Sequence, residues 1–218
     1  VGKSTMDIGL MEEGDSFTDV AGPLGQATPI KKVGTIVGVA GGIGVAPLLP
    51  QIKLHKEIGN HVITIVGART RDLLILKDET EQASHEVIFA TDDGTFGYHG
   101  FVTGALEELI RQGRQIDEVT AIGPVRMMQA TCNLTRKHSI PTLVSLNAVM
   151  VDGTGMCGCC RVTVGGETKF SCVDGPDFDG HKVDFDELAS RQAFFRDEEN
   201  LARELAEQKR GGCKCHEK

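Results

Sequence analysis

The sequence has no tryptophan, only one tyrosine, and no excess of basic residues, since its formal net charge is −8. A nucleic-acid-binding surface needs a basic face to hold phosphates, so this charge argues against nucleic acid as a partner. No apolar run approaches the roughly 20 residues that cross a bilayer, and the N-terminal residues hold no apolar signal-peptide core. We therefore expect a cytoplasmic protein that binds neither nucleic acid nor membrane.

Cysteine is also too scarce for a disulfide scaffold, with seven residues in a chain of 218. Their spacing is uneven: Cys157, Cys159, Cys160 and Cys172 crowd together, and a second pair lies at 213 and 215. Tight clusters in a chain without a secretory signal indicate metal or redox chemistry in a reducing compartment. We expect the pair at 213 and 215 to be exposed and inert.

The middle of the chain alternates apolar, strand-like runs with helical patterns. Strands are predicted at 33–40, 61–68, 86–91, 118–123 and 141–147, and helices at 45–58, 101–112 and 125–138. Strands that are hydrophobic throughout and separated by helices are typical of a parallel sheet covered on both faces. This α/β core is predicted over residues 32–147, and a charged amphipathic helix over 183–211.

A glycine-rich loop, "GVAGGIGVAP" (38–47), joins the first predicted strand to the first helix. At the carboxyl edge of a parallel sheet, glycines let the backbone approach a pyrophosphate, and the helix N-terminus offers N–H groups. The spacing departs from the usual dinucleotide pattern, so a tight turn without a ligand is the alternative. Polar loops at 91–100 and 123–128 reach the same edge, which favours a binding crevice. The residues predicted to bind the dinucleotide are Gly41, Gly42, Gly44, Arg69, Asp92, Gly94, Gly123 and Pro124.

The cysteine-rich stretch reads Cys157-x2-Cys160, followed by Cys172. These are three of the four positions of plant-type [2Fe–2S] ligation, C-x4-C-x2-C…C. The first position, five residues before Cys157, is Asp152, whose carboxylate can ligate iron. The stretch "RVTVGGETKFSC" predicts a hairpin that delivers Cys172. A zinc site with one more ligand, or thiols with a redox role or none, remain the alternatives.

Together these motifs resemble a known family, the iron–sulfur flavoprotein subunits related to the dihydroorotate dehydrogenase electron-transfer subunit. The resemblance is strongest to the branch of small subunits of NADH-dependent reduced ferredoxin:NADP oxidoreductases. It is carried by "VGKST", "GPLG", "GVAGGIGVAPLLP", "VGARTRDLL", "TDDGTFGYHGFVT", "IGPVRMM", the Asp152-to-Cys172 pattern and "CVDGPDFDGHKVDFDEL". These motifs are spread over most of the chain.

The resemblance implies a fold of four parts: the end of an FAD-binding β-barrel (1–31), a ferredoxin-reductase-like NAD domain (32–147), a small [2Fe–2S] domain (148–182), and a C-terminal helix and tail (183–218). Ser4 and Thr5 would contact the FAD pyrophosphate. Asp152, Cys157, Cys160 and Cys172 would ligate the cluster. The family's upstream Arg-x-Tyr-Ser/Thr flavin motif is absent, so this sequence reads as the continuation of an upstream barrel segment.

The function that the resemblance implies is electron transfer between NAD(H), FAD and a [2Fe–2S] cluster, and on to a large partner subunit with flavin and iron–sulfur centres. Ferredoxin is a further candidate partner, and flavin-based electron bifurcation a candidate activity. Because cofactors carry this chemistry, no acid–base residue is expected. Two alternatives stay open: an electron-transfer subunit of a dihydroorotate dehydrogenase, and a non-enzymatic zinc- or redox-sensing module that binds a nucleotide.

Overall fold

The computed structural model describes residues 2–211, which form two compact units. One unit consists of residues 24–189, and the other of residues 2–23 together with 190–211. No helix in the described range is long and apolar enough to cross a membrane.

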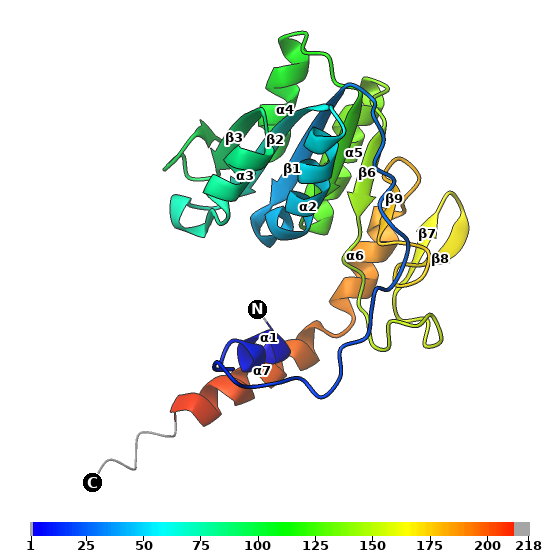
Figure 1. Ribbon diagram of the computed structural model, residues 1–218. Helices are drawn as coiled ribbons and strands as arrows, with labels where there is room; N and C mark the ends of the chain where they lie inside the picture. The colour runs from blue at the N-terminus through cyan, green and yellow to red at the C-terminus, as the bar shows by residue number, and fades with distance from the viewer. Residues whose placement is uncertain (1, 212–218) are drawn as a thin grey trace. The chain divides into compact units, whose positions relative to one another are not determined.

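The larger unit is built on a seven-stranded sheet with the order β4-β3-β2-β1-β5-β6-β9 (Figure 1). Strands β1 to β6 pair in parallel, and β9 joins the edge antiparallel to β6. The predicted parallel α/β sheet is therefore confirmed. The strand bounds are β1 Thr35–Gly41, β2 His61–Ala68, β3 Glu86–Thr91, β4 Tyr98–His99, β5 Glu118–Ile122, β6 Thr142–Ser145 and β9 Asp177–Asp179.

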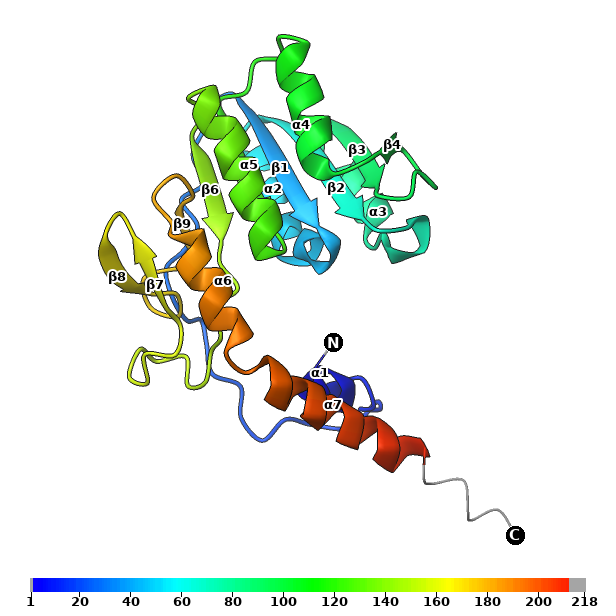
Figure 2. The ribbon, with the colours of Figure 1, turned by 180° about the vertical axis from the view of Figure 1, so that it is seen from behind.

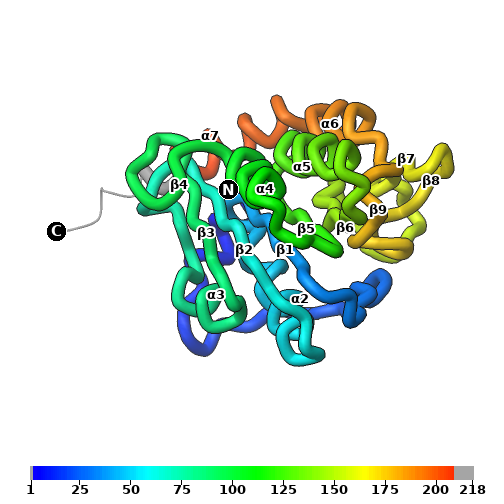
Figure 3. The backbone as a smooth tube through the Cα atoms, turned by 90° about the horizontal axis from the view of Figure 1, so that it is seen from above, coloured from blue at the N-terminus to red at the C-terminus, as the bar shows by residue number. Residues whose placement is uncertain are grey.

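Helices cover both faces of this sheet, as the view from above shows (Figure 3). One face carries α2 and α3, and the other carries α4 and α5. The helix bounds are α2 Val45–Glu57, α3 Lys77–Ala83, α4 Val102–Arg111 and α5 Val125–Lys137, with short 3-10 turns η1 Gly42–Gly44 and η2 Arg71–Leu73.

Strand β1 shows why its sequence is apolar throughout. Ile36 and Ala40 belong to the core under α2, whereas Val37 and Val39 belong to the core under α4 and α5. Successive side chains of a strand point to opposite faces, so a sheet covered on both sides needs apolar residues at every position. Gly38 lies against α2, where a Cβ would come within 3.1 Å of the Ile52 side chain.

The cysteine-rich stretch forms the predicted hairpin, with β7 Arg161–Val164 and β8 Glu167–Phe170 as a separate two-stranded sheet. The chain then returns to the main sheet as β9, pairing Phe178 with Val144. The predicted NAD and cluster domains thus lie in one compact unit. The domain boundaries proposed from the sequence remain predictions.

In the smaller unit, α1 Lys3–Ile8 and α7 Arg196–Gly211 lie side by side (Figures 1 and 2). Residues 2–34 of the described chain contain no strand, so the predicted end of a β-barrel gains no support there. The single helix predicted over 183–211 is wrong, because α6 Phe185–Ala193 ends before Phe194 and α7 begins at Arg196. The run Asp197–Glu199 is acidic and suits the positive end of a new helix.

Candidate functional site

The glycine loop lies where the strand order of the sheet changes direction. From β1 the chain moves outward through β2, β3 and β4, then returns to β5 on the other side of β1. The carboxyl ends of β1 and β5 therefore diverge into helices on opposite faces, and ligands of open parallel sheets bind in this crevice. Gly41 ends β1, and Gly123 follows β5 at Ile122.

The glycines at this point bring the two loops into contact. A Cβ on Gly44 would overlap the carbonyl group of Ile122, and a Cβ on Gly41 would lie 2.8 Å from Pro124 Cδ. Gly123 meets Gly41 in the same way, because its Cβ would lie 3.0 Å from the Gly41 nitrogen. The structure thus brings together Gly41, Gly44, Gly123 and Pro124, as the sequence predicts for one binding edge.

Gly42 differs from these neighbours, because no atom of the described residues, its two chain neighbours aside, lies within 4 Å of the position its Cβ would take. Its φ is +56°, in the left-handed region that favours glycine. A ligand backbone or pyrophosphate could approach here without displacing a side chain.

The loops after β2 and β3 form the neighbouring part of the edge. The N–H of Asp92 donates to the Ala68 carbonyl at 3.1 Å, and the Asp93 N–H donates to the Arg69 carbonyl at 3.2 Å. Arg69 and Asp92 are exposed. Gly94 has a φ of +73°, and a Cβ there would meet the His99 ring at 2.8 Å, so its glycine is required by the turn itself.

Two side chains of this edge were not assigned from the sequence. Met127 of α5 lies over Gly123, whose Cβ would come within 2.9 Å of the Met127 Cε. Phe96 lies beneath two cations, with Arg71 Cζ at 5.4 Å and Lys77 Nζ at 5.5 Å from the ring centre. The motifs "GPVRMM" and "TDDGTFGYHG" contain both residues, but only tertiary contacts show which members face the edge.

Ser4 and Thr5, predicted to contact FAD, lie in α1 of the smaller unit. Both are exposed there. The other predicted site residues lie in the larger unit, and the role of Ser4 and Thr5 stays a prediction.

The cysteine loop brings two of the predicted cluster ligands into direct contact. Cys160 and Cys172 are buried, and their Sγ atoms lie 3.2 Å apart. The hairpin produces this approach, since the Ser171 N–H donates to the Cys160 carbonyl at 3.1 Å just beyond the β7–β8 ladder. The hydrogen bond from the Cys160 thiol raises the pKa of Cys172, and burial raises it further.

The other two predicted ligands form a second, exposed pair. One carboxylate oxygen of Asp152 accepts the Cys157 N–H at 3.0 Å, and the other accepts the Thr154 N–H at 2.9 Å. The hydrogen bond from Thr154 is the main reason that the pKa of Asp152 is lowered. Among the described residues, no group of three or more His, Cys, Asp or Glu side chains is arranged to hold a metal ion.

The loop nevertheless fits an iron–sulfur cluster in its chemistry. Gly153, Gly155 and Gly158 all have positive φ, which only glycine adopts readily. These turns direct backbone N–H groups toward sulfur: Gly155 donates to Cys172, and Cys159 donates to the Cys157 Sγ at 3.5 Å. Such donors stabilise the thiolates that clusters require.

The remaining cysteines are accounted for separately. Cys159 is half-buried beside the pair, and no disulfide links the five cysteines that the structure describes. Cys132 lies in the core under α5, where burial raises its pKa to about 12, so it is an inert thiol. Cys213 and Cys215, predicted to be inert, lie outside the described residues.

Comparison with known proteins bears directly on this arrangement. Residues 147–184 match the family model of the iron–sulfur cluster binding domain of dihydroorotate dehydrogenase B. A Thermotoga maritima protein named as a homologue of the dihydroorotate dehydrogenase B (NAD(+)) electron transfer subunit is 48% identical over 204 residues, which cover 94% of this chain and 72% of the relative. The chain belongs to the family of dihydroorotate dehydrogenase B electron-transfer subunits.

One further sequence relative and one solved structure are also similar to this chain. A Methanocaldococcus jannaschii protein, named as a probable subunit of the same kind, is 36% identical over 85% of this chain and 70% of its own length. A solved structure of NADH-dependent reduced ferredoxin-NADP oxidoreductase, described for flavin-based electron bifurcation, superposes with a TM-score of 0.88. It is 45% identical and covers 94% of this chain and 74% of its own.

Family membership confirms several predictions made from the sequence. The chain is an electron-transfer subunit of an iron–sulfur flavoprotein, with a mostly parallel, ferredoxin-reductase-like fold. The predicted cofactor set of FAD, a [2Fe–2S] cluster and NAD(H) agrees with this family. The matched domain binds iron–sulfur, which removes the ground for the zinc alternative.

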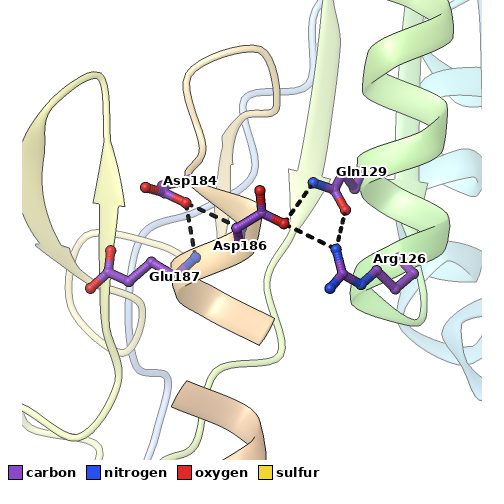
Figure 4. Close-up of polar contacts among 5 residues, drawn as sticks. All are labelled: Arg126, Gln129, Asp184, Asp186 and Glu187. Carbon is purple, nitrogen blue, oxygen red and sulfur yellow. Dashed lines mark hydrogen bonds and ion pairs between the residues drawn. The ribbon is translucent and has the colours of Figure 1, made fainter. Parts of the chain in front are cut away.

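A cleft of about 440 Å³ in this electron-transfer subunit lies apart from these residues, beside α5, the β7–β8 turn and residues 182–186. Figure 4 shows Arg126 and Gln129 of α5 converging on Asp186, whose Oδ1 lies 3.0 Å from Arg126 Nη1 and 3.2 Å from Gln129 Nε2. Asp184 caps α6 by accepting the N–H groups of Asp186 and Glu187 (Figure 4). These contacts attach α6 to α5 beside the cleft.

Proposed function

We propose that Asp152, Cys157, Cys160 and Cys172 of this electron-transfer subunit hold one [2Fe–2S] cluster. The observation that carries the proposal is the 3.2 Å approach of the Cys160 and Cys172 thiols, within a stretch that matches an iron–sulfur binding domain. The contact between Asp152 and the Cys157 backbone supports the same set, because it places the carboxylate at the first position of the loop.

NAD(H) binding is proposed at the carboxyl edge of the sheet. Gly42 leaves room for a pyrophosphate, the N-terminus of α2 supplies N–H groups, and Arg69 supplies an exposed positive charge. Asp92, Gly94, Gly123 and Pro124 complete the edge. When bound, the nicotinamide, the flavin and the cluster supply the hydride and single-electron chemistry, while the chain supplies position and electrostatics.

The enzyme is proposed to be of the NADH-dependent reduced ferredoxin:NADP oxidoreductase type, acting in the reducing environment of the cytoplasm. The 45% identity to that structure over 94% of this chain supports the assignment. Its partner is then a larger flavin- and iron–sulfur-containing subunit, with ferredoxin as a second redox partner.

A second candidate is the electron-transfer subunit of a dihydroorotate dehydrogenase. Its support is that relatives at 36% and 31% identity are named so. Purification of the native complex separates the two candidates. A partner subunit that oxidises dihydroorotate would favour the second, and one that reduces NADP would favour the first.

Anaerobic reconstitution of the chain with iron and sulfide tests the cluster proposal. We expect a red-brown protein with about two irons and two sulfides per chain and an EPR signal after reduction. The absence of tryptophan lets NADH fluorescence report nucleotide binding without protein background from that residue. A colourless protein that takes up zinc in preference to iron would refute the cluster.

A further inference from the structure

We propose that Cys160 and Cys172 form a redox-active pair, which closes to a disulfide in the cluster-free chain and thereby prevents cluster loading. The formation of the disulfide is inferred from the geometry of the two thiols alone. The effect of the disulfide on cluster loading goes beyond the proposed function and rests on that function, because it requires that both thiols serve as cluster ligands.

The distance between the two sulfurs carries the proposal. Their Sγ atoms lie 3.2 Å apart, and a disulfide bond needs a separation of about 2.05 Å. The difference is within reach of small side-chain rotations, so the bond can form without refolding of the hairpin. The Ser171-to-Cys160 backbone hydrogen bond holds the two strand ends together at this point.

Proximity selects this pair over the more accessible thiol. Cys157 is exposed, yet its Sγ accepts a backbone N–H from Cys159, and its own N–H is bound by Asp152. Cys132 is held in the separate core beneath α5. The short sulfur–sulfur contact joins Cys160 to Cys172.

The oxidant must be small, because Cys160 is 2% and Cys172 is 6% exposed. Hydrogen peroxide meets this requirement. One thiol reacts with it to give a sulfenic acid and water, and the second thiol displaces a further water as the S–S bond forms. The two sulfurs together give two electrons to the peroxide, and both thiol protons leave in water. A dithiol reductant reverses the bond by exchange.

The disulfide would remove two of the four proposed ligands from use. Of the four proposed ligands, Asp152 and Cys157 alone would remain for iron, and one thiolate among them is too few for a stable cluster. An oxidised chain would keep its fold but would not bind the cluster until the disulfide is reduced. The cluster site would thus have two exclusive forms, metallated or disulfide-bonded.

Peptide mapping tests the pair in the cluster-free full chain. Serine replaces Cys213 and Cys215, so that these thiols cannot compete, and one equivalent of peroxide is added. Trypsin leaves Cys172 alone in the peptide 170–182 and the other three cysteines of the stretch in 138–161. We expect these two peptides to be joined in the oxidised sample and separate after reduction.

Matched variants identify the cysteine of the longer peptide. Cys160→Ser should abolish the link, whereas Cys157→Ser and Cys159→Ser should leave it in place. A link that persists in Cys160→Ser, or the absence of any link to Cys172 in the parent, overturns the proposal.

Cluster reconstitution tests the consequence. The oxidised chain should lose cluster uptake, and a dithiol should restore it to the level of the reduced chain. Equal uptake by the oxidised and reduced chains would refute the control of loading. Failure of the reduced chain to take up a cluster would instead refute the proposed ligand set. The peptide map would still show whether Cys160 and Cys172 form a disulfide.

Discussion

At the scale of single residues, the glycines of the edge loop have different tasks. Gly41 and Gly44 allow two backbone segments to touch, and a side chain at either would displace β5 or its loop. Gly42 has open space around it and needs glycine only for its positive φ. This distinction makes Gly42 the position at which ligand binding can be separated from folding.

Gly42→Val is expected to weaken NAD(H) binding by about tenfold or more, which corresponds to at least about 1.4 kcal/mol. The added side chain would occupy the open space beside the loop. Gly113→Val is the matched control, because Gly113 also has positive φ and no atom within 4 Å of its Cβ position, yet lies between α4 and β5. Titration of NADH fluorescence measures both variants. Equal affinities for NADH in the two would contradict the assignment of the loop.

Glu118 gives a prediction about pH. Burial raises the pKa of Glu118, against a smaller opposing effect of Lys31, and its Oε1 has no hydrogen-bond partner among the residues that the structure describes. The folded chain therefore holds this proton more tightly than the unfolded chain. Its contribution to stability is present below the ordinary pKa of glutamate and is lost as pH rises toward the raised value.

The stability of Glu118→Gln relative to the parent should accordingly be greater at pH 8 than at pH 4, because the parent loses the contribution of Glu118 as the pH rises. Urea unfolding at the two pH values measures the difference, with Glu107→Gln on the exposed face of α4 as the control. The same difference between Glu118→Gln and the parent at both pH values would show that the carboxyl does not couple to folding.

The residues of the site were predictable where a local pattern determines their role. The spacing from Asp152 to Cys172 and the cluster of glycines at 41–44 are patterns of this kind. Met127 and Phe96 were not, because a methionine on a helix or a phenylalanine in a loop has no local mark of what it will contact. Their position at the carboxyl edge follows only from the strand order, which brings distant loops to one edge of the sheet.

At the scale of elements, strands β1, β2, β3, β5 and β6 and helices α2, α4 and α5 follow from apolar runs and helical periodicity, with bounds within a few residues of the predictions. Helix α3 and strand β4 were not predicted. Strand β9 could not be predicted, since three residues, "DFD", gain their strand pairing only from β6. The break between α6 and α7 was also missed. The amphipathic pattern of the sequence continues through Phe194 and Phe195, so it does not mark the break. In the structure the rings of these two residues contact each other, with their centres 4.9 Å apart.

Helix α6 is expected to be part of the larger unit's core. Leu188 is 1% exposed and packs within the same core as α5. Leu188→Ala should lower the free energy of unfolding by about 2–5 kcal/mol, because it leaves a cavity. Leu205→Ala on α7, at a site 49% exposed, should change it by less than about 0.5 kcal/mol. Circular dichroism during urea unfolding compares them, and equal losses would refute the anchoring of α6.

At the scale of the whole molecule, α7 belongs to a different compact unit from the sheet. Its exposed apolar residues include Leu201, and Phe194 just before it is 76% exposed. Exposed large apolar side chains of this kind commonly contact a partner protein. The amphipathic pattern of residues 183–211 was predicted from the sequence, but the division of this segment between two compact units was not.

A chain ending at Ala193 should therefore remain folded and lose binding to the large partner subunit. This cut keeps Phe185 and Leu188 in the core, whereas a cut after Lys182 would remove them. Co-purification with the partner measures the effect, and the double variant Phe194→Ser and Leu201→Ser is its full-length counterpart. Undiminished co-purification of the truncated chain would refute docking through α7.

The EPR spectrum of the reduced, reconstituted chain tests whether Asp152, Cys157, Cys160 and Cys172 together hold one cluster. In Asp152→Cys we expect the cluster to be retained with a changed spectrum and reduction potential, because a thiolate replaces an oxygen ligand on one iron. Asp152→Ala should weaken cluster retention, and Cys159→Ser should leave both retention and spectrum unchanged. If Cys159→Ser loses the cluster while Asp152→Ala keeps it with an unchanged spectrum, Cys159 and not Asp152 is the fourth ligand.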